Sequence, residues 1–264
     1  MSTEPTRYRN PDTLLQELGI ANPQEIEIET VAQHCGATIV YELLEGCAGR
    51  VIGNRDRAII TVNRSARLEQ QRFTAAHELG HWIWHRGKVA LICDHDQLTR
   101  EWTGNNKEVA ANRYAAELLM PAYLFQPMAA GKPITFDTVR SLAKQFHTSL
   151  TATAVRLVEL ATSPCMAVYS TRDRRTQFIP SAAMKAAEQW PRRTLRPETG
   201  AYGLLHREDE PCGPVTLPAS VWFGGEEAKI AQVIEDSIPV TTHLVLTLLS
   251  WQALSPSASQ LSSV

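Results

Sequence analysis

The chain has 264 residues, and its 26 lysines and arginines nearly balance 28 aspartates and glutamates, which leaves a formal net charge of −2 at pH 7. This balance argues against a protein that mainly coats nucleic acid or an anionic membrane, because both functions need an excess of cations. The five cysteines are odd in number and form no C-x-x-C pair, so we expect free thiols in a reducing compartment rather than a disulfide framework.

The sequence carries no recognisable targeting or membrane signal. Its first residues, MSTEPTRYRNPD, lack the apolar core of a signal peptide. No apolar run approaches the roughly 18 to 20 residues that cross a bilayer. We therefore expect a soluble, cytoplasmic protein that does not contact a membrane.

Short elements are predicted before the first long helix. They are helices at 11–18 and 29–35 and strands at Ala37–Tyr41 and Arg57–Val62. The glycines at positions 46, 49 and 53 indicate turns between the two strands.

Longer helices follow in the middle of the chain. They are expected at Ala66–His85, at Lys107–Met120 before Pro121, and at Thr138–Phe146 and Leu150–Leu160. The last two are separated only by His147-Thr148-Ser149, which is the outline of a helix-turn-helix pair.

Ser163-Pro164 interrupts this helical pattern, and we place a domain boundary there. Beyond it the sequence predicts one helix, Ser181–Gln189, and strands at Met166–Ser170, Thr176–Ile179, Ser220–Phe223, Lys229–Ile234 and His243–Trp251. The Ser-rich end of the chain, 253–264, is expected to be disordered.

The most informative stretch is His77-Glu78-Leu79-Gly80-His81, an H-E-x-x-H pattern on a predicted helix. Positions four apart differ by roughly 40° around a helix, so both imidazoles lie on one face and can bind one metal ion. Glu78 lies about 100° further round, where its carboxylate can reach a metal-bound water as a general base. A helix whose histidines occur by chance is the simpler alternative.

The third ligand must come from nearby acids or histidines. His85 lies about 12 Å from His77 along the helix, too far to share one ion easily. Glu108 and Glu117 on the next helix point to opposite sides, and Glu108 shares a face with small residues that permit close packing. We therefore favour Glu108, with Asn112 one turn on as the acceptor of a histidine N–H. A second site at Asp94, His95 and Asp96 is a minor alternative.

The two motifs together resemble the ImmA/IrrE metallopeptidase family. They are RFTAAHELGH at 72–81 and EVAANRYAAELLMP at 108–121, within a resemblance that covers roughly residues 25–160. The resemblance implies a gluzincin-like site with His77, His81 and Glu108 as ligands of Zn²⁺, or of Mn²⁺, and Glu78 as the base. It also implies a substrate class, since characterised members cut a helix-turn-helix (XRE-type) transcriptional repressor and so relieve repression in stress, DNA-damage or mobile-element responses.

The sequence predicts an α+β fold. It comprises a zincin-like helical peptidase domain with a small sheet (1–125), a helix-turn-helix-like helical segment (126–163), a mixed α/β domain (164–252) and the tail (253–264). The radiation-response members of the family carry a GAF-like sensor, so the third domain is expected to be GAF-like and sensory, with a packing or partner-docking module as the alternative.

Several roles remain open at the level of sequence. Tyr114 is a candidate contact for the oxyanion or substrate, and the Arg57–Val62 strand is a candidate edge for an extended substrate. Arg156 matches an Arg-Leu pair of the family without an assignable role. Direct DNA binding by the helical pair is disfavoured because its charges are modest. The rival function is a non-proteolytic regulator that binds a repressor or DNA and keeps a structural or vestigial metal site.

Overall fold

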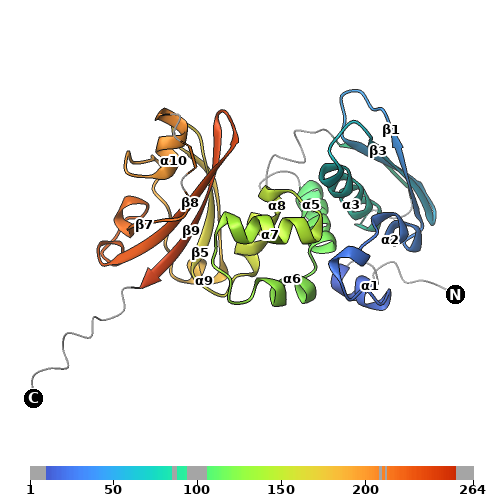
Figure 1. Ribbon diagram of the computed structural model, residues 1–264. Helices are drawn as coiled ribbons and strands as arrows, with labels where there is room; N and C mark the ends of the chain where they lie inside the picture. The colour runs from blue at the N-terminus through green and yellow to red at the C-terminus, as the bar shows by residue number, and fades with distance from the viewer. Residues whose placement is uncertain (1–9, 85–87, 94–105, 208–209, 212, 254–264) are drawn as a thin grey trace, which may run out of the picture. The chain divides into compact units, whose positions relative to one another are not determined.

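The computed structural model describes residues 10–84, 88–93, 106–207, 210–211 and 213–253 (Figure 1). The chain divides into two compact units, each of which contains its own β-sheet. One unit comprises Met1–Ala130 and Leu142–Ser149, and the other comprises Gly131–Ser141 and Leu150–Val264. The α+β class predicted from the sequence is confirmed. In the described part of the chain, no helix is both long and apolar enough to cross a membrane.

The N-terminal unit combines a four-stranded sheet with helices. The strands are β1 (Ala37–Glu42), β2 (Gly49–Asn54), β3 (Arg57–Asn63) and β4 (Lys88–Cys93), in the order β1-β3-β2-β4. The helices are α1 (Pro11–Glu17), α2 (Ile28–His34), α3 (Leu68–Trp84), α5 (Asn106–Leu119) and α6 (Ala122–Ala129), with a 3₁₀ turn at Pro23–Glu25. β1 runs parallel to β3, whereas the β2–β3 and β2–β4 pairs are antiparallel.

Helix α3 lies between the sheet and helix α5, because it packs against β2 and β3 on one side and against α5 on the other. Ile60 and Val62 of β3 meet Ala76 and Leu79 of α3 in one buried apolar cluster. The helix is buried on several faces from Thr74 to Ile83, so its polar side chains in this region lie inside the unit. Burial of this kind places the H-E-x-x-H residues away from bulk water on most sides.

The structure corrects the prediction for the first sheet. The segment read as glycine turns contains strand β2, and β3 lies inside the sheet between β1 and β2 rather than at an edge. Strand β2 has a glycine at position 49 because helix α3 lies close to it there. A Cβ atom at Gly49 would lie only 2.5 Å from Thr74 Cγ2. Strand glycines often mark such close approaches. Strand β4 and helix α6, which contains Pro127, were not predicted.

Two helices follow, α7 (Phe136–Phe146) and α8 (Leu150–Leu160), which confirms the predicted helical pair. The break between them begins at His147, whose φ is +53°, a left-handed conformation that ends a helix. Asp236 Oδ2 accepts a hydrogen bond from the Phe136 backbone N–H at 2.7 Å. This bond ties the start of α7 to the sheet of the C-terminal unit.

The C-terminal unit is built on a five-stranded antiparallel sheet of order β6-β5-β9-β8-β7. Its strands are β5 (Cys165–Ser170), β6 (Arg175–Pro180), β7 (Val215–Pro218), β8 (Ala231–Thr241) and β9 (Leu244–Ala253). Its short helices are α9 (Ala182–Ala186) and α10 (Gly200–Tyr202), with a π-helical turn at Gly203–Arg207 and 3₁₀ turns at Ala219–Val221 and Glu227–Lys229.

Two predictions in this unit were wrong in detail. The strand expected at Ser220–Phe223 is mainly a 3₁₀ turn, because Trp222 and Phe223 are anchored in the core and Trp222 Nε1 donates to buried Glu235. The helix expected at Ser181–Gln189 ends at Ala186, before Glu188, whose φ is +50°. The tail prediction for 254–264 lies outside the described residues.

Candidate metal centre

Helix α3 brings the two histidines of the motif to one buried face. The side chains of His77 and His81 are 0% and 1% exposed. Their rings meet edge to face with centroids 4.6 Å apart, and the two Nε2 atoms are 3.0 Å apart. The helix spacing has therefore placed two imidazole nitrogens together, as the sequence predicts.

Glu108 of α5 completes a group of three. Its carboxylate oxygens lie 3.2 Å from His77 Nε2 and 3.3 Å from His81 Nε2. One ligand atom from each residue lies within 4.8 Å of the other two. Glu108 is 22% exposed, so this group opens towards solvent on the side of the carboxylate.

Gly80 permits the close packing of α3 and α5 that this arrangement needs. A Cβ atom at Gly80 would lie 3.2 Å from Ala111 Cα and 3.2 Å from Tyr114 Cβ. A side chain there would push α5 away and carry Glu108 with it. The glycine in the H-E-x-x-H motif is thus a packing requirement of the site.

Asn112 fixes the tautomer of His77. Its Oδ1 lies 2.9 Å from His77 Nδ1, and since an amide oxygen only accepts, Nδ1–H donates. With Nδ1–H as the donor, Nε2 of the neutral His77 ring is the nitrogen that can bind a metal ion. Asn112 therefore contacts the ring of His77, and its supporting role at a metal ion stays a prediction.

The donor set fits a divalent cation. The pKa of Glu108 is lowered chiefly by the hydrogen bond that a protonated His77 ring donates and also by the positive charge of protonated histidines, whereas burial raises it, so the carboxylate stays ionised. Two imidazole nitrogens and one carboxylate are ligands that Zn²⁺ accepts, and three protein ligands leave one coordination position for water or substrate. His77, His81 and Glu108 are the residues that would hold the ion.

Glu78 is fully buried and faces a different neighbour from the two histidines. A Cβ at Gly49 of β2 would lie only 3.2 Å from Glu78 Oε1. The carboxylate therefore lies between α3 and the backbone of β2, while the histidines face α5. This separation agrees with the roughly 100° turn expected between adjacent helix positions.

The remaining candidates lie as follows. Tyr114 of α5 is 2% exposed, and burial raises its pKa well above the ordinary value, so the phenol stays neutral. Its contact with an oxyanion or substrate stays a prediction. Glu117 is paired with Arg113 at 2.8 Å, away from the histidines. Arg156 of α8 is 7% exposed and lies 3.7 Å from Glu159.

Some sequence candidates cannot be placed, and others were missed. His85 and the Asp94, His95 and Asp96 group lie outside the described residues. Gly49 was read as a turn, although a glycine inside an Ile- and Val-containing segment is itself a signal of close backbone approach. Among the described cysteines, Cys35, Cys47 and Cys165 are not joined in disulfides.

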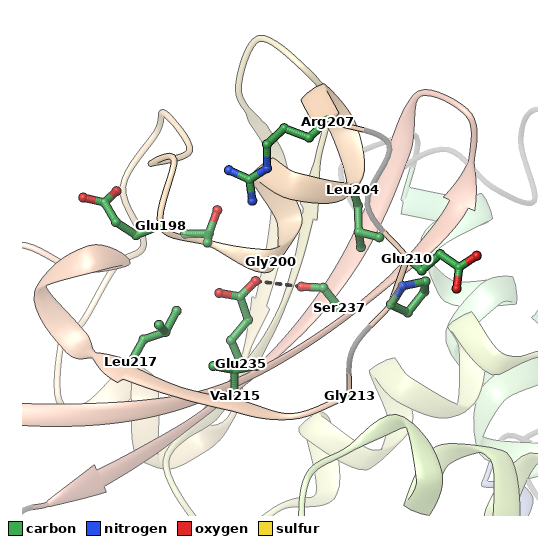
Figure 2. Close-up of a pocket in the computed structure, with 12 residues that line it drawn as sticks. Glu198, Gly200, Leu204, Arg207, Glu210, Gly213, Val215, Leu217, Glu235 and Ser237 are labelled. Carbon is green, nitrogen blue, oxygen red and sulfur yellow. Dashed lines mark hydrogen bonds between the residues drawn. The ribbon is translucent and has the colours of Figure 1, made fainter.

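The C-terminal unit contains a separate cavity of about 290 Å³ (Figure 2). Glu235 lies at its base, and its carboxylate accepts hydrogen bonds from Ala201 N, Ser237 Oγ and Trp222 Nε1 at 2.8–2.9 Å. Burial raises the Glu235 pKa, and these hydrogen bonds oppose the increase. Arg207 is among the residues that line the cavity (Figure 2). The buried carboxylate thus has its donors supplied by the protein.

Comparison with known proteins identifies a matching protein family and a solved structure with a similar fold. Residues 32–158 match a peptidase family model described as the IrrE N-terminal-like domain. The radiation response metalloprotease IrrE of Deinococcus deserti is 32% identical over 136 residues, which cover 47% of this chain and 48% of that protein. The protein of the same name from Deinococcus radiodurans is 35% identical over 107 residues, which cover 40% and 32%. The chain therefore spans half or less of the length of these relatives.

A solved structure titled Mycobacterium tuberculosis transcriptional regulator is similar over more of the chain. The match covers 91% of this chain and 74% of that one, with a TM-score of 0.59 and 12% sequence identity. At this identity the likeness concerns the fold alone.

Proposed function

We propose that the chain is a zinc-dependent, site-specific endopeptidase of the ImmA/IrrE family, because residues 32–158 match the IrrE N-terminal-like peptidase family and two metalloproteases are 32% and 35% identical to it. Its proposed substrate is a helix-turn-helix (XRE-type) transcriptional repressor, whose cleavage relieves repression in a stress, DNA-damage or mobile-element response. The observation that carries the proposal is the convergence of His77, His81 and Glu108 within 4.8 Å. The relatives are named radiation response metalloproteases, which supports a role in a stress response.

The proposed reaction assigns a task to each residue. His77, His81 and Glu108 hold the ion, and Asn112 keeps the His77 Nε2 lone pair available to it. A bound Zn²⁺ or Mn²⁺ ion would supply Lewis acidity to the peptide carbonyl and to water. Glu78 takes the proton of the attacking water and passes it to the leaving amine.

The C-terminal unit has a regulatory role in this proposal. We assign it as a GAF-like sensory module that controls the peptidase in the cytoplasm. The cavity above Glu235 supports such a role because it offers a concave, mixed polar and apolar lining. A packing or partner-docking module is the alternative, and absence of any thermal shift across candidate metabolites would favour it.

The direct test is a cleavage assay on a helix-turn-helix repressor encoded beside this chain. Purified protein is incubated with the repressor in Zn²⁺, in Mn²⁺ and in chelator, and the products are identified by intact-mass spectrometry. One discrete cut that requires metal is the expected result. Glu78→Gln should reduce its rate by about 10² to 10⁴, the usual contribution of a general base.

Glu69→Gln, on the same helix but exposed, is the matched control and should cut like the wild type. Metal content is measured for each variant, because Glu78→Gln should retain the ion whereas His77→Ala should lose it. Cleavage that survives Glu78→Gln would refute the assignment. Tight binding of intact repressor or DNA without a cut would support the non-proteolytic regulator instead.

A further inference from the structure

Positive charge is concentrated in one part of the C-terminal unit. Residues 172–207 contain seven arginines and one lysine against three acids, a net charge of +5 in a chain whose total is −2. The arginines occur mainly in two short segments, 172–175 and 192–196. The peptidase proposal uses neither of these segments.

The fold brings the two segments together. The Arg175 backbone N–H donates to Arg193 O at 2.8 Å, and Arg175 Nε lies 3.4 Å from Arg192 O. An open concavity of about 430 Å³ results, and it is lined by Arg174, Arg175, Thr176 and Arg193. Three arginines and one threonine therefore line the same depression. The Thr176 hydroxyl already donates to Tyr169 O, so the arginines are the hydrogen-bond donors that an anion would meet there.

The positive charge of this concavity is not balanced by neighbouring acids. Among the residues that the structure describes, none of the three arginines is within ion-pair distance of a carboxylate. Burial and the nearby charge of Arg193 both lower the pKa of Arg175, so the two guanidinium groups repel each other. An anion in the concavity would relieve that repulsion, and guanidinium groups match phosphate geometry well.

Aromatic rings adjoin these cations. The Arg175 guanidinium lies 4.5 Å from the centroid of the Phe178 ring, and the Trp190 ring lies 5.6 Å from that of Phe178. Trp190 is 47% exposed although it is large and apolar. Proteins that bind single-stranded nucleic acid combine cations that follow the phosphates with exposed aromatic rings on which bases stack.

We propose that the concavity formed by Arg174, Arg175, Thr176 and Arg193, together with Trp190, binds single-stranded nucleic acid. The arginines contact successive phosphates, and Trp190 stacks on a base. The helical pair α7 and α8 offers less to such a ligand, because Arg140 is paired with Asp137 at 2.8 Å and Arg156 is buried. This binding is independent of the proposed peptidase reaction.

The test is fluorescence anisotropy of a labelled single-stranded DNA of about 16 nucleotides, the upper end of a typical single-module site size. The full-length protein is titrated at several salt concentrations. Arg174→Gln combined with Arg193→Gln should weaken binding roughly tenfold or more, and should reduce the slope of log K against log salt by about 1.4, the loss of two phosphate contacts. Trp190→Ala should weaken binding roughly tenfold without changing the slope.

The charge-matched control combines Arg140→Gln with Lys229→Gln, two cations that already have carboxylate partners. It should bind like the wild type, and thermal melting should show that every variant is folded. Equal losses in both double variants would overturn the proposal, as would an absence of binding at low salt. Binding to inorganic pyrophosphate or to anionic phosphatidylserine vesicles, but not to the oligonucleotide, would also overturn it.

Discussion

Each unit of the molecule buries a cluster of polar groups, and the two clusters differ in their balance of donors and acceptors. At His77, His81 and Glu108, the two imidazole Nε2 atoms and the carboxylate oxygens lie 3.0–3.3 Å apart. At Glu235, three protein donors meet one carboxylate. We expect the first cluster to be complete only with a cation, whereas the second is complete in the protein itself. A buried carboxylate therefore indicates a ligand-binding site only when the protein itself does not supply its hydrogen-bond donors.

The largest effect on stability is expected for the cluster around Glu235. Glu235→Ala removes the acceptor for Trp222 Nε1, Ser237 Oγ and Ala201 N, each of which costs about 1–3 kcal/mol when left unpaired in a buried position. We expect the free energy of unfolding of the C-terminal unit to fall by about 3 kcal/mol or more. Chemical denaturation followed by tryptophan fluorescence measures this change.

The matched control is Glu198→Ala, an exposed residue that lines the same cavity, which should stay within about 0.5 kcal/mol of the wild type. Metal binding at the other cluster should be unchanged in both variants. A stable Glu235→Ala protein would contradict the view that this carboxylate is structural.

For the cluster of His77, His81 and Glu108, which we call the cation-requiring cluster, we expect stability to depend on added metal. Zn²⁺ at 100 times its dissociation constant should stabilise the folded N-terminal unit by about 2.7 kcal/mol. His77→Ala should abolish this gain. Differential scanning calorimetry with and without chelator is the measurement, and a Zn²⁺-induced shift that survives His77→Ala would place the ion elsewhere.

A smaller effect within the same cluster is expected for Asn112→Ala. The substitution removes the acceptor of His77 Nδ1–H, 2.9 Å away, and frees the ring to rotate or change tautomer. Loss of such a supporting partner typically lowers metal affinity by about 10- to 100-fold. Competition with a chelating dye gives the dissociation constant, and Lys107→Ala, at an exposed position of the same helix, is the control.

The sequence predicted the cation-requiring cluster because its two histidines lie four residues apart on one helix, and helical periodicity separates the two acids of the next helix. His77 and His81 share one face by spacing alone, and the choice of Glu108 over Glu117 followed from opposite faces of one helix. Both inferences need only local geometry and one helix–helix contact. The resemblance to the ImmA/IrrE family then indicated that the reaction is metal-dependent peptide hydrolysis.

The features that the sequence did not predict depend on contacts between different helices, strands and loops, which no residue spacing indicates. Gly49 has a role only because Thr74 and Glu78 of α3 lie against β2. Glu235 receives its donors from Ala201 and Trp222, which are 34 and 13 residues away. The arginine concavity forms because residue 175 pairs with residue 193 across a loop. No periodicity in a single segment encodes such contacts.

The smallest expected effect is the dependence of stability on pH in the C-terminal unit. Burial raises the pKa of Glu235 and of Asp236 above their ordinary values, so the folded protein binds more protons than the unfolded chain over this range. The contribution to stability is therefore full below the unfolded pKa and is lost as the pH rises through the folded pKa. Glu108, whose pKa is lowered, acts in the opposite direction at lower pH.

Denaturation with chelator present, at a series of pH values from about 4 to 8, should thus show a decline in the wild type that is flatter in Glu235→Gln, which cannot titrate. Glu198→Gln, at an exposed position that lines the same cavity, should keep the wild-type slope. If Glu235→Gln declines as steeply as the wild type, the Glu235 carboxyl is ionised throughout this range in the folded protein. Its three donors would then outweigh burial, and the C-terminal cluster would be a stabilised anion rather than a carboxyl that folding keeps protonated.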